Sequence, residues 1–351
     1  MNPRTARSAL AVATVTVLAS ACSLSGGSGG DAQQTPEVTL VTHDSFVAPQ
    51  DVLDAFQRQS GLKLKVVKYG DAGELTNKLV LTKANPIGDV AYGVDSTFAS
   101  RALGEGVFQP YTSPEADRGP QRYSVDPEHR LSAVDLGDGG VNVDSGYFTS
   151  KGLAEPKTYD DLADPKYKDL TVAEDPATAS PGLAFLLGTI AKFGEQGWQG
   201  YWTKLKANGL KVDSGWEEAY TKDFSGSSGK GPRPIVVSYA SSPAAEVGQD
   251  GKPRTKALLD TCYRQVEYAG VLTGSKNLPQ AQKVVDFLLS QQFQTTVPAN
   301  MYVYPARQGV DLPAGWAQVA PLPPAPATLP ADQVQAGREK WIGAWRSLMG
   351  A

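Results

Sequence analysis

The chain contains few of the side chains that form disulfides or bind transition metals. Its 351 residues include two cysteines and two histidines. Cys22 directly follows the N-terminal leader described below and only Cys262 lies in the main body, so we expect no intramolecular disulfide. Because His43 and His129 lie far apart in the sequence, no zinc-site spacing is present. We therefore expect no metal site and no cofactor.

Motifs of common enzyme classes are also missing. No G-x-S-x-G nucleophile elbow occurs in the body of the chain from residue 37 onwards. The run 226–230 (GSSGK) has Gly231 where a phosphate loop needs Ser or Thr to hold Mg²⁺. The run 137–140 (GDGG) lacks the glycine spacing of a dinucleotide fingerprint and is typical of a turn. We predict that the protein is not an enzyme, and an exported hydrolase is the alternative from another class.

No apolar run suits a permanent membrane span, which needs roughly 20 residues. Residues 8–21 come nearest, and they follow Arg4 and Arg7 and end in small residues, which is the pattern of a secretory signal. The residues before Cys22 resemble a bacterial lipobox, with Ala19 where Leu is usual. We predict a signal peptide at 1–21 and lipidation of Cys22; an ordinary signal with an incidental cysteine is the alternative.

The next segment, residues 22–36, is rich in Gly and Ser and has no apolar period. Such a segment is a flexible tether with an end-to-end distance of roughly 20 Å. It suits a globular body held by a lipid at the outer face of the cell membrane. Loss of Arg4 and Arg7 takes the net charge from −4 to −6, which argues against nucleic acid as a partner.

From residue 37 onwards, short apolar strands alternate with amphipathic helices, and this order predicts an α/β fold with a parallel sheet covered by helices. We predict strands at 37–42, 62–69, 88–94, 170–173, 235–239 and 266–272. We predict helices at 51–58, 74–84, 183–193, 216–224, 279–291 and from Asp332 onwards. Ser180 as N-cap and Pro181 open the helix 183–193 and Gly194 ends it, and Ser242-Pro243 begins a helix by the same device.

Polar and aromatic side chains gather where the predicted strands end. Asp44 and Ser45 follow the first strand, and Asp95 follows the third. Ligands of open parallel sheets bind outside the carboxyl ends of the strands, so these residues are expected to face one crevice. The alternative is that each aspartate caps the next helix.

Further candidates come from the second half of the chain. Trp216 and Tyr220 are four residues apart and share a helix face that can stack on a flat ligand, or can simply be core. Tyr239 and Ser241 lie at another junction between a strand and a helix. The helix start at Ser180 offers unpaired N–H groups to an anion or a phosphate. A cationic aromatic ligand, with or without phosphate, fits all three features.

Several segments resemble the thiamine-binding proteins of bacterial ABC transporters. The similarity runs in order along residues 36–350 and is carried by 42–46 (THDSF), 88–95 (GDVAYGVD), 175–183 (DPATASPGL), 214–220 (SGWEEAY), 237–243 (VSYASSP), 297–305 and the closing helix 338–345. The resemblance implies a two-lobed type II periplasmic-binding-protein fold with the ligand in a cleft between the lobes. It also implies a monomer that delivers thiamine or thiamine phosphate to a permease and its ATPase.

Carried over by this resemblance, Asp44 and Asp95 would address the ligand's rings. Trp216, Tyr220 and Tyr239 would stack on it, and Ser180 and Ser241 would receive a phosphate or hydroxyl. Lobe 1 is predicted at 37–134 plus 265–303, and lobe 2 at 135–264 plus 304–351.

Three departures from the family pattern affect the ligand preference. Val47-Ala48-Pro49 replaces a segment that usually holds Trp, Tyr302 stands in for another Trp, and His43 replaces a usual Tyr. Ferric iron and polyamines are the alternative ligands, although the chain has no Tyr-Tyr pair of the kind that related iron binders use.

The predicted anchor is open to a direct test. Replacing Cys22 by Ala should move the protein from the membrane fraction to the medium, or leave an uncleaved precursor, because the acylated thiol is gone. Fractionation followed by intact-mass measurement checks this. Wild-type mass and wild-type membrane association in the Cys22→Ala variant would show that Cys22 is not the anchor.

Overall fold

The computed structural model describes residues 35–227 and 230–350. The predicted signal peptide, Cys22 and nearly all of the tether lie outside these residues. Within the described part, no helix combines the length and the apolar character needed to cross a membrane. Residues 35–351 form one compact unit, and our boundaries between the two lobes stay a prediction.

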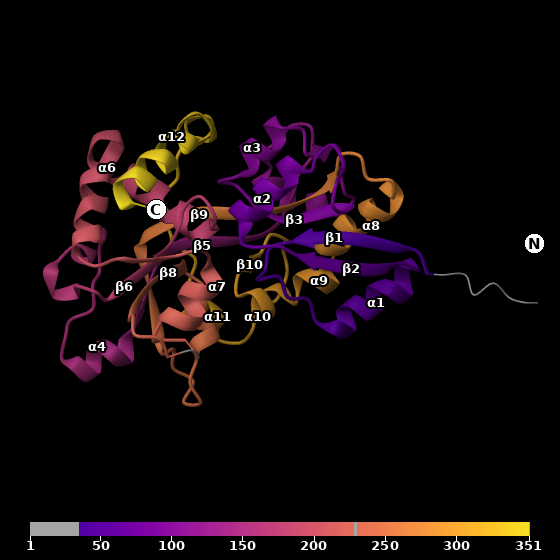
Figure 1. Ribbon diagram of the computed structural model, residues 1–351. Helices are drawn as coiled ribbons and strands as arrows, with labels where there is room; N and C mark the ends of the chain where they lie inside the picture. Colours follow the sequence, from indigo (N-terminus) through magenta and orange to yellow (C-terminus); the bar gives the residue numbers. More distant parts are fainter. Residues whose placement is uncertain (1–34, 228–229, 351) are drawn as a thin grey trace, which may run out of the picture. The chain divides into compact units, whose positions relative to one another are not determined.

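Ten strands form one mixed sheet in the order β2-β1-β3-β9-β5-β8-β6-β7, with β4 added to β9 and β10 added to β5 (Figure 1). Their bounds are β1 Glu37–Thr42, β2 Lys63–Lys68, β3 Val90–Asp95, β4 Phe108–Gln109, β5 Ser132–Asp144, β6 Thr171–Glu174, β7 Lys211–Asp213, β8 Ile235–Tyr239, β9 Thr255–Leu272 and β10 Tyr304–Pro305.

Helices cover both faces of this sheet. The α-helices are α1 Gln50–Ser60, α2 Ala72–Leu81, α3 Ala99–Gly104, α4 Ser145–Lys151, α5 Tyr159–Leu162, α6 Ser180–Ala207, α7 Trp216–Glu218, α8 Leu278–Leu289, α9 Gln291–Gln294, α10 Val297–Met301, α11 Trp316–Val319 and α12 Ala331–Met349. Turns of 3₁₀-helix are η1 Ala116–Arg118, η2 Pro120–Tyr123, η3 Pro165–Tyr167 and η5 Ser242–Glu246, and η4 Ala219–Asp223 is a turn of π-helix.

The first half of the sheet, β2-β1-β3, is parallel and confirms the predicted βαβαβ order. Leu40 on β1 pairs with Val66 on one side and Val90 on the other. Leu40 and Val90 are fully buried, as central strands of a parallel sheet require. Phe56 from α1 packs on Phe287 from α8 beneath this half, with ring centroids 4.6 Å apart.

The predicted all-parallel sheet is wrong at its centre. The long strands β5 and β9 pair antiparallel with each other, and they connect the first half of the sheet to the second. The run 137–140, which we interpreted as a turn, lies inside β5. Its glycines are needed by close packing, because a β-carbon at Gly139 would lie 2.7 Å from that of Ala184.

The second half, β8-β6-β7, is again parallel; helix α6 packs on it, and α12 packs on α6. Helix α6 changes direction at Gly194, which has φ 71°, at the position where we predicted a terminator. The N-cap of α6 is Ala179 and not Ser180 as predicted, because the Ser180 hydroxyl has a different partner, described below. The predicted helix at Ser242 is only the short turn η5.

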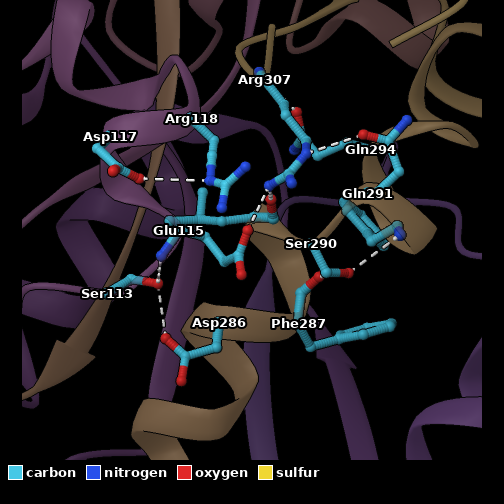
Figure 2. Close-up of polar contacts among 12 residues, drawn as sticks. Ser113, Glu115, Asp117, Arg118, Asp286, Phe287, Ser290, Gln291, Gln294 and Arg307 are labelled. Carbon is cyan, nitrogen blue, oxygen red and sulfur yellow. Dashed lines mark hydrogen bonds and ion pairs between the residues drawn. The ribbon is translucent and has the colours of Figure 1, made fainter. Parts of the chain in front are cut away.

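A polar network attaches the loop before β5 to α8 and to the segment after β10 (Figure 2). Ser113 donates to Asp286 on α8 at 2.6 Å. Arg307 reaches Glu115 at 2.5 Å and also donates to the carbonyl of Leu289 at 2.9 Å. Arg307 follows shortly after residues 301–303, which line the site described below, so these contacts anchor the chain next to that segment.

The core of the second half depends on tryptophan packing between α6 and α12. Trp345 is fully buried and meets Trp202 edge to face at 5.5 Å. Trp345→Ala should lower the free energy of unfolding by about 3–5 kcal/mol, because it leaves a large cavity. Lys340→Ala, on the same helix with its side chain 74% exposed, is the control and should cost less than about 0.5 kcal/mol. Chemical denaturation of both variants checks this, and equal losses would contradict the assigned packing.

Candidate functional site

A small cavity lies where the two halves of the molecule meet. The first half contributes His43 and Ser45 after β1 and Asp71 before α2. The second half contributes Trp216 from α7 and Tyr239 at the end of β8, while further walls come from β9 and from residues 301–303. The cavity volume is about 30 Å³, roughly the space of one water molecule in the liquid.

An open hollow continues from this cavity towards the surface. It shares Ser45, Trp216 and Tyr302 with the cavity and has a volume of about 520 Å³. Its charged lining is two acids, Glu217 and Glu246, and one base, Arg254. Arg254 is paired with Glu246 at 2.7 Å, so the hollow has a net negative charge. Cavity and hollow together make up the candidate site.

Asp71 is the most connected acid of the cavity. Its carboxylate accepts backbone N–H groups from Ala72 at 2.7 Å, from Ser180 at 3.1 Å and from Trp216 at 3.1 Å. Removal from water raises the pKa of Asp71 to about 6, against the three N–H donors. At pH 7 the carboxylate is ionised and occupies the start of α6, where we expected a ligand phosphate.

A chain of buried groups lies beneath the cavity. The Tyr92 hydroxyl contacts Asp135, and it also lies 3.1 Å from Glu267. A phenol has one hydrogen and cannot donate to two carboxylates. Burial and the nearby Glu267 charge raise the pKa of Asp135 well above its usual range. Neutral Asp135 therefore donates to Tyr92, and Tyr92 donates to an ionised Glu267 that faces the cavity.

His43 is the basic group of the cavity floor. Its Nε2 lies 3.4 Å from Glu267 Oε2. Burial is the largest single influence and opposes protonation, but the carboxylates of Glu267, Asp71 and Asp44 together outweigh it, so the pKa of His43 is raised. His43 thus neutralises part of the Glu267 charge. Asp71 has no such basic partner within the cavity lining.

The opposite wall is aromatic. Trp216 stacks on Tyr220 with ring centroids 4.8 Å apart and an interplanar angle of 18°. Its indole N–H donates to Ser238 at 2.8 Å, which fixes the ring orientation. Tyr239 lies 6.4 Å from Trp216, tilted by 48°. One face of Trp216 is covered by Tyr220, so Tyr220 supports the wall from behind.

Tyr302 closes the site from the third side. It ends α10 in a left-handed conformation, with φ 57°. For a residue other than glycine this conformation costs on the order of 1 kcal/mol or more, and such residues are frequent at ligand sites. The strained turn carries Tyr302 into both the cavity and the hollow.

The structure brings together five of the residues that the sequence predicted. Ser45, Trp216, Tyr239 and Tyr302 line the cavity, and Tyr220 lines the hollow. The other four lie outside the lining. Asp44 is half-buried beside Ser45, and Ser241 is buried at the start of η5. Asp95 and Ser180 are buried next to each other, so none of these four side chains forms part of the walls.

Asp95 and Ser180 contact each other across the two halves. The Ser180 hydroxyl donates to Asp95. The second oxygen of Asp95 accepts N–H groups from Thr97 at 2.6 Å and Phe98 at 3.2 Å, which matches the alternative that Asp95 caps the following turn. Burial raises the pKa of Asp95 to about 6.

Sequence reasoning missed Asp71 and Glu267 and gave His43 no role in the site. Asp71 could have been found, because it follows the second strand as Asp44 and Asp95 follow the first and third. Glu267 gave no such signal, since it lies inside the long strand β9. Across residues 35–227 and 230–350, no group of three or more His, Cys, Asp or Glu side chains is placed to hold a metal ion.

Comparison with known proteins places this architecture in context. Residues 85–324 match the family model of bacterial extracellular solute-binding proteins. The thiamine-binding periplasmic protein of Salmonella typhimurium is 31% identical, over 89% of this chain and 93% of that protein. The protein of the same description from Brucella abortus is 30% identical, over 90% and 92%.

Solved structures agree with these relatives. A periplasmic thiamin-binding protein superposes with a TM-score of 0.79 at 28% identity, covering 91% of this chain and 98% of that one. The fold is therefore α/β of the two-lobed type II periplasmic-binding class, with the ligand cleft between the lobes. More distant matches include a ferric-binding protein from Bordetella, with a TM-score of 0.63 at 23% identity, which shares the fold alone.

Proposed function

This chain belongs to the bacterial extracellular solute-binding proteins, and within that family we propose that it captures thiamine, or thiamine phosphate, and delivers it to an ABC importer. Its partners are then a permease with its ATPase, and the protein acts as a monomer outside the cell membrane, held there through Cys22. The names of its relatives support this ligand, and so does the chemistry of the cleft.

The pairing of ionised carboxylates with an aromatic wall supports the proposal most strongly. Thiamine combines a permanently cationic thiazolium with a flat aminopyrimidine. Asp71 and Glu267 offer negative charge from one side, and Trp216 and Tyr239 offer ring faces from the other. A desolvated contact between a cation and an aromatic ring is worth about 2 kcal/mol.

The cleft is less favourable for phosphorylated forms of thiamine than for thiamine itself. The helix start that would accept a phosphate holds Asp71 instead, and the outer hollow has a net negative charge. A ligand phosphate would have to displace Asp71 to reach these N–H groups. The geometry therefore favours unphosphorylated thiamine.

Ligand capture also requires the cleft to open. The inner cavity, which holds Asp71 and Glu267, has a volume of only about 30 Å³, so the two halves have to separate before a ring can pass from the outer hollow to these carboxylates. Type II binding proteins with such a cleft respond to ligand by a shift between open and closed states. We propose that the closed, loaded form is the one presented to the permease.

Substitution of Trp216 tests the assignment. Trp216→Ala should weaken thiamine binding roughly 10- to 30-fold, because it removes the stacking face at a cost of about 2 kcal/mol. Trp216→Phe keeps an aromatic face, loses the bond to Ser238 and should weaken binding about 3-fold. Calorimetric titration checks both variants.

The same titration separates the ligands. Thiamine should bind more tightly than thiamine monophosphate, and spermidine and ferric citrate should give no heat. Binding of spermidine or iron in place of thiamine would contradict the assignment of thiamine as the ligand. Wild-type affinity of the Trp216→Ala variant for thiamine would contradict the placement of the binding site at Trp216. Turnover of model esters or glycosides would point to a hydrolase.

Binding should also depend on pH. A cation binds the ionised form of Asp71, so protons compete with the ligand around the Asp71 pKa of about 6. Affinity should fall roughly 10-fold between pH 7 and pH 5. Protonation of His43, whose pKa is raised, acts in the same direction. Titration at both pH values checks this, with Asp71→Asn as the control that should show a smaller change. Equal wild-type affinity at the two pH values would contradict it.

A further inference from the structure

Asp71 connects the two sides of the cleft through backbone groups. It lies at the N-cap of α2, in the first half of the molecule, and accepts the N–H of Ala72 there. Its other two donors, Ser180 N–H and Trp216 N–H, both belong to the second half. One carboxylate thus binds three helix starts that come from both sides.

The two helix starts of the second half form one unit. Thr178, just before α6, donates its hydroxyl to the carbonyl of Ser214, just before α7, at 2.6 Å. The free N–H groups at a helix start carry partial positive charge and favour an anion. An ionised Asp71 fits this position, and its pKa of about 6 keeps it ionised at pH 7.

The backbone of α2 docks at the same place. The N–H groups of Gly73 and Glu74 donate to the carbonyl of Thr178, at 2.9 Å and 3.3 Å. Gly73 permits this approach, because a β-carbon there would lie 2.5 Å from the carbonyl oxygen of Ala177. The contact around Asp71 is therefore close-packed as well as charged.

We propose that Asp71 is the latch of the cleft: it holds the two halves closed and positions the Trp216 wall. For its effect on ligand release the proposal rests on the function proposed above. Asp71 acts on Trp216 through the backbone N–H and is thus a positioning residue for the aromatic wall. A ligand that finds the latch formed leaves more slowly, because the halves must separate first.

The charged and titratable groups that face Asp71 are His43, Asp44, Glu174 and Tyr239. Glu174 is fully buried, and burial raises its pKa well above the usual range, so it is neutral at pH 7. The Asp44 carboxylate repels the negative charge of Asp71, and the protonated form of His43 attracts that charge. The latch is therefore intact at pH 7.

Two variants break the latch by different means. Asp71→Asn still caps α2 through its amide oxygen, but its NH₂ group faces an N–H donor. Gly73→Ala leaves every charge in place and adds the β-carbon that collides with Ala177, while alanine favours the helix itself. Both variants should fold as the wild type does, which thermal unfolding checks.

Two controls separate the latch from general effects. Asp144→Asn alters a carboxylate that caps α4 through Tyr147 N–H at 3.1 Å and does not line the cleft. Lys340→Ala alters an exposed side chain of α12 that pairs with Glu195 of α6 at 3.5 Å, within the second half.

The measurements are small-angle scattering of the ligand-free proteins and stopped-flow tryptophan fluorescence with thiamine. Asp71→Asn and Gly73→Ala should have a larger radius of gyration than the wild type. Both should release thiamine at least 10-fold faster, with a smaller change in the association rate. Both controls should resemble the wild type in radius.

Two outcomes overturn the latch. An unchanged radius in both variants would show that Asp71 does not hold the halves together. A radius raised equally by Asp144→Asn would show that the effect is not specific to this carboxylate. If the wild type binds no thiamine, the function proposed above fails, and the scattering of the ligand-free proteins still tests the latch.

Discussion

The antiparallel pairing of β5 with β9 is the constraint on which the cleft depends. These two strands run through both halves of the sheet, so every wall of the cleft is positioned relative to them. Their pairing places Asp135 directly opposite Glu267. Two like charges in such a pair repel, and burial together with the Glu267 charge resolves the conflict by raising the pKa of Asp135, while the Tyr92 hydroxyl lies between the two carboxyl groups. The result is one ionised carboxylate at the floor of the cleft, with His43 beside it.

The same logic of buried carboxylates governs the contact between the two halves. Asp71 and Asp95 both reach from the first half to Ser180, one to its N–H and one to its hydroxyl. Each loses water on closure, and each regains hydrogen bonds from helix starts or turns. Closure therefore exchanges hydration for directed contacts, and its free energy is a small difference between two large opposing contributions. A single substituent, such as the missing β-carbon of Gly73, is enough to shift that balance.

Much of the fold could be predicted from local pattern, and the centre of the sheet could not. Apolar runs between predicted helices indicate parallel strands at 37–42, 62–69 and 88–94, and the structure confirms these strands. Strand β5 carries glycines and aspartates that favour a turn by composition, and only its tertiary neighbours explain them. Ser45 and Tyr239 followed from the ends of strands, Trp216 and Tyr220 from helical spacing, and Tyr302 from the family resemblance. Glu267 could not be found this way, because its role is set by Tyr92 and His43 across the sheet.

The position of Asp71 changes how the charge of the cleft is interpreted. A helix start at Ser180 suggests an anion site when the sequence is considered alone, and the structure does place an anion there. That anion belongs to the protein, so the cleft as a whole presents carboxylates where a phosphate receptor would present free N–H groups. Glu267 has His43 as an ion-pair partner at 3.4 Å, whereas the direct contacts of Asp71 are three backbone N–H groups. The less compensated carboxylate therefore lies beside Trp216, which is where a cationic ring gains from the carboxylate and the indole face together.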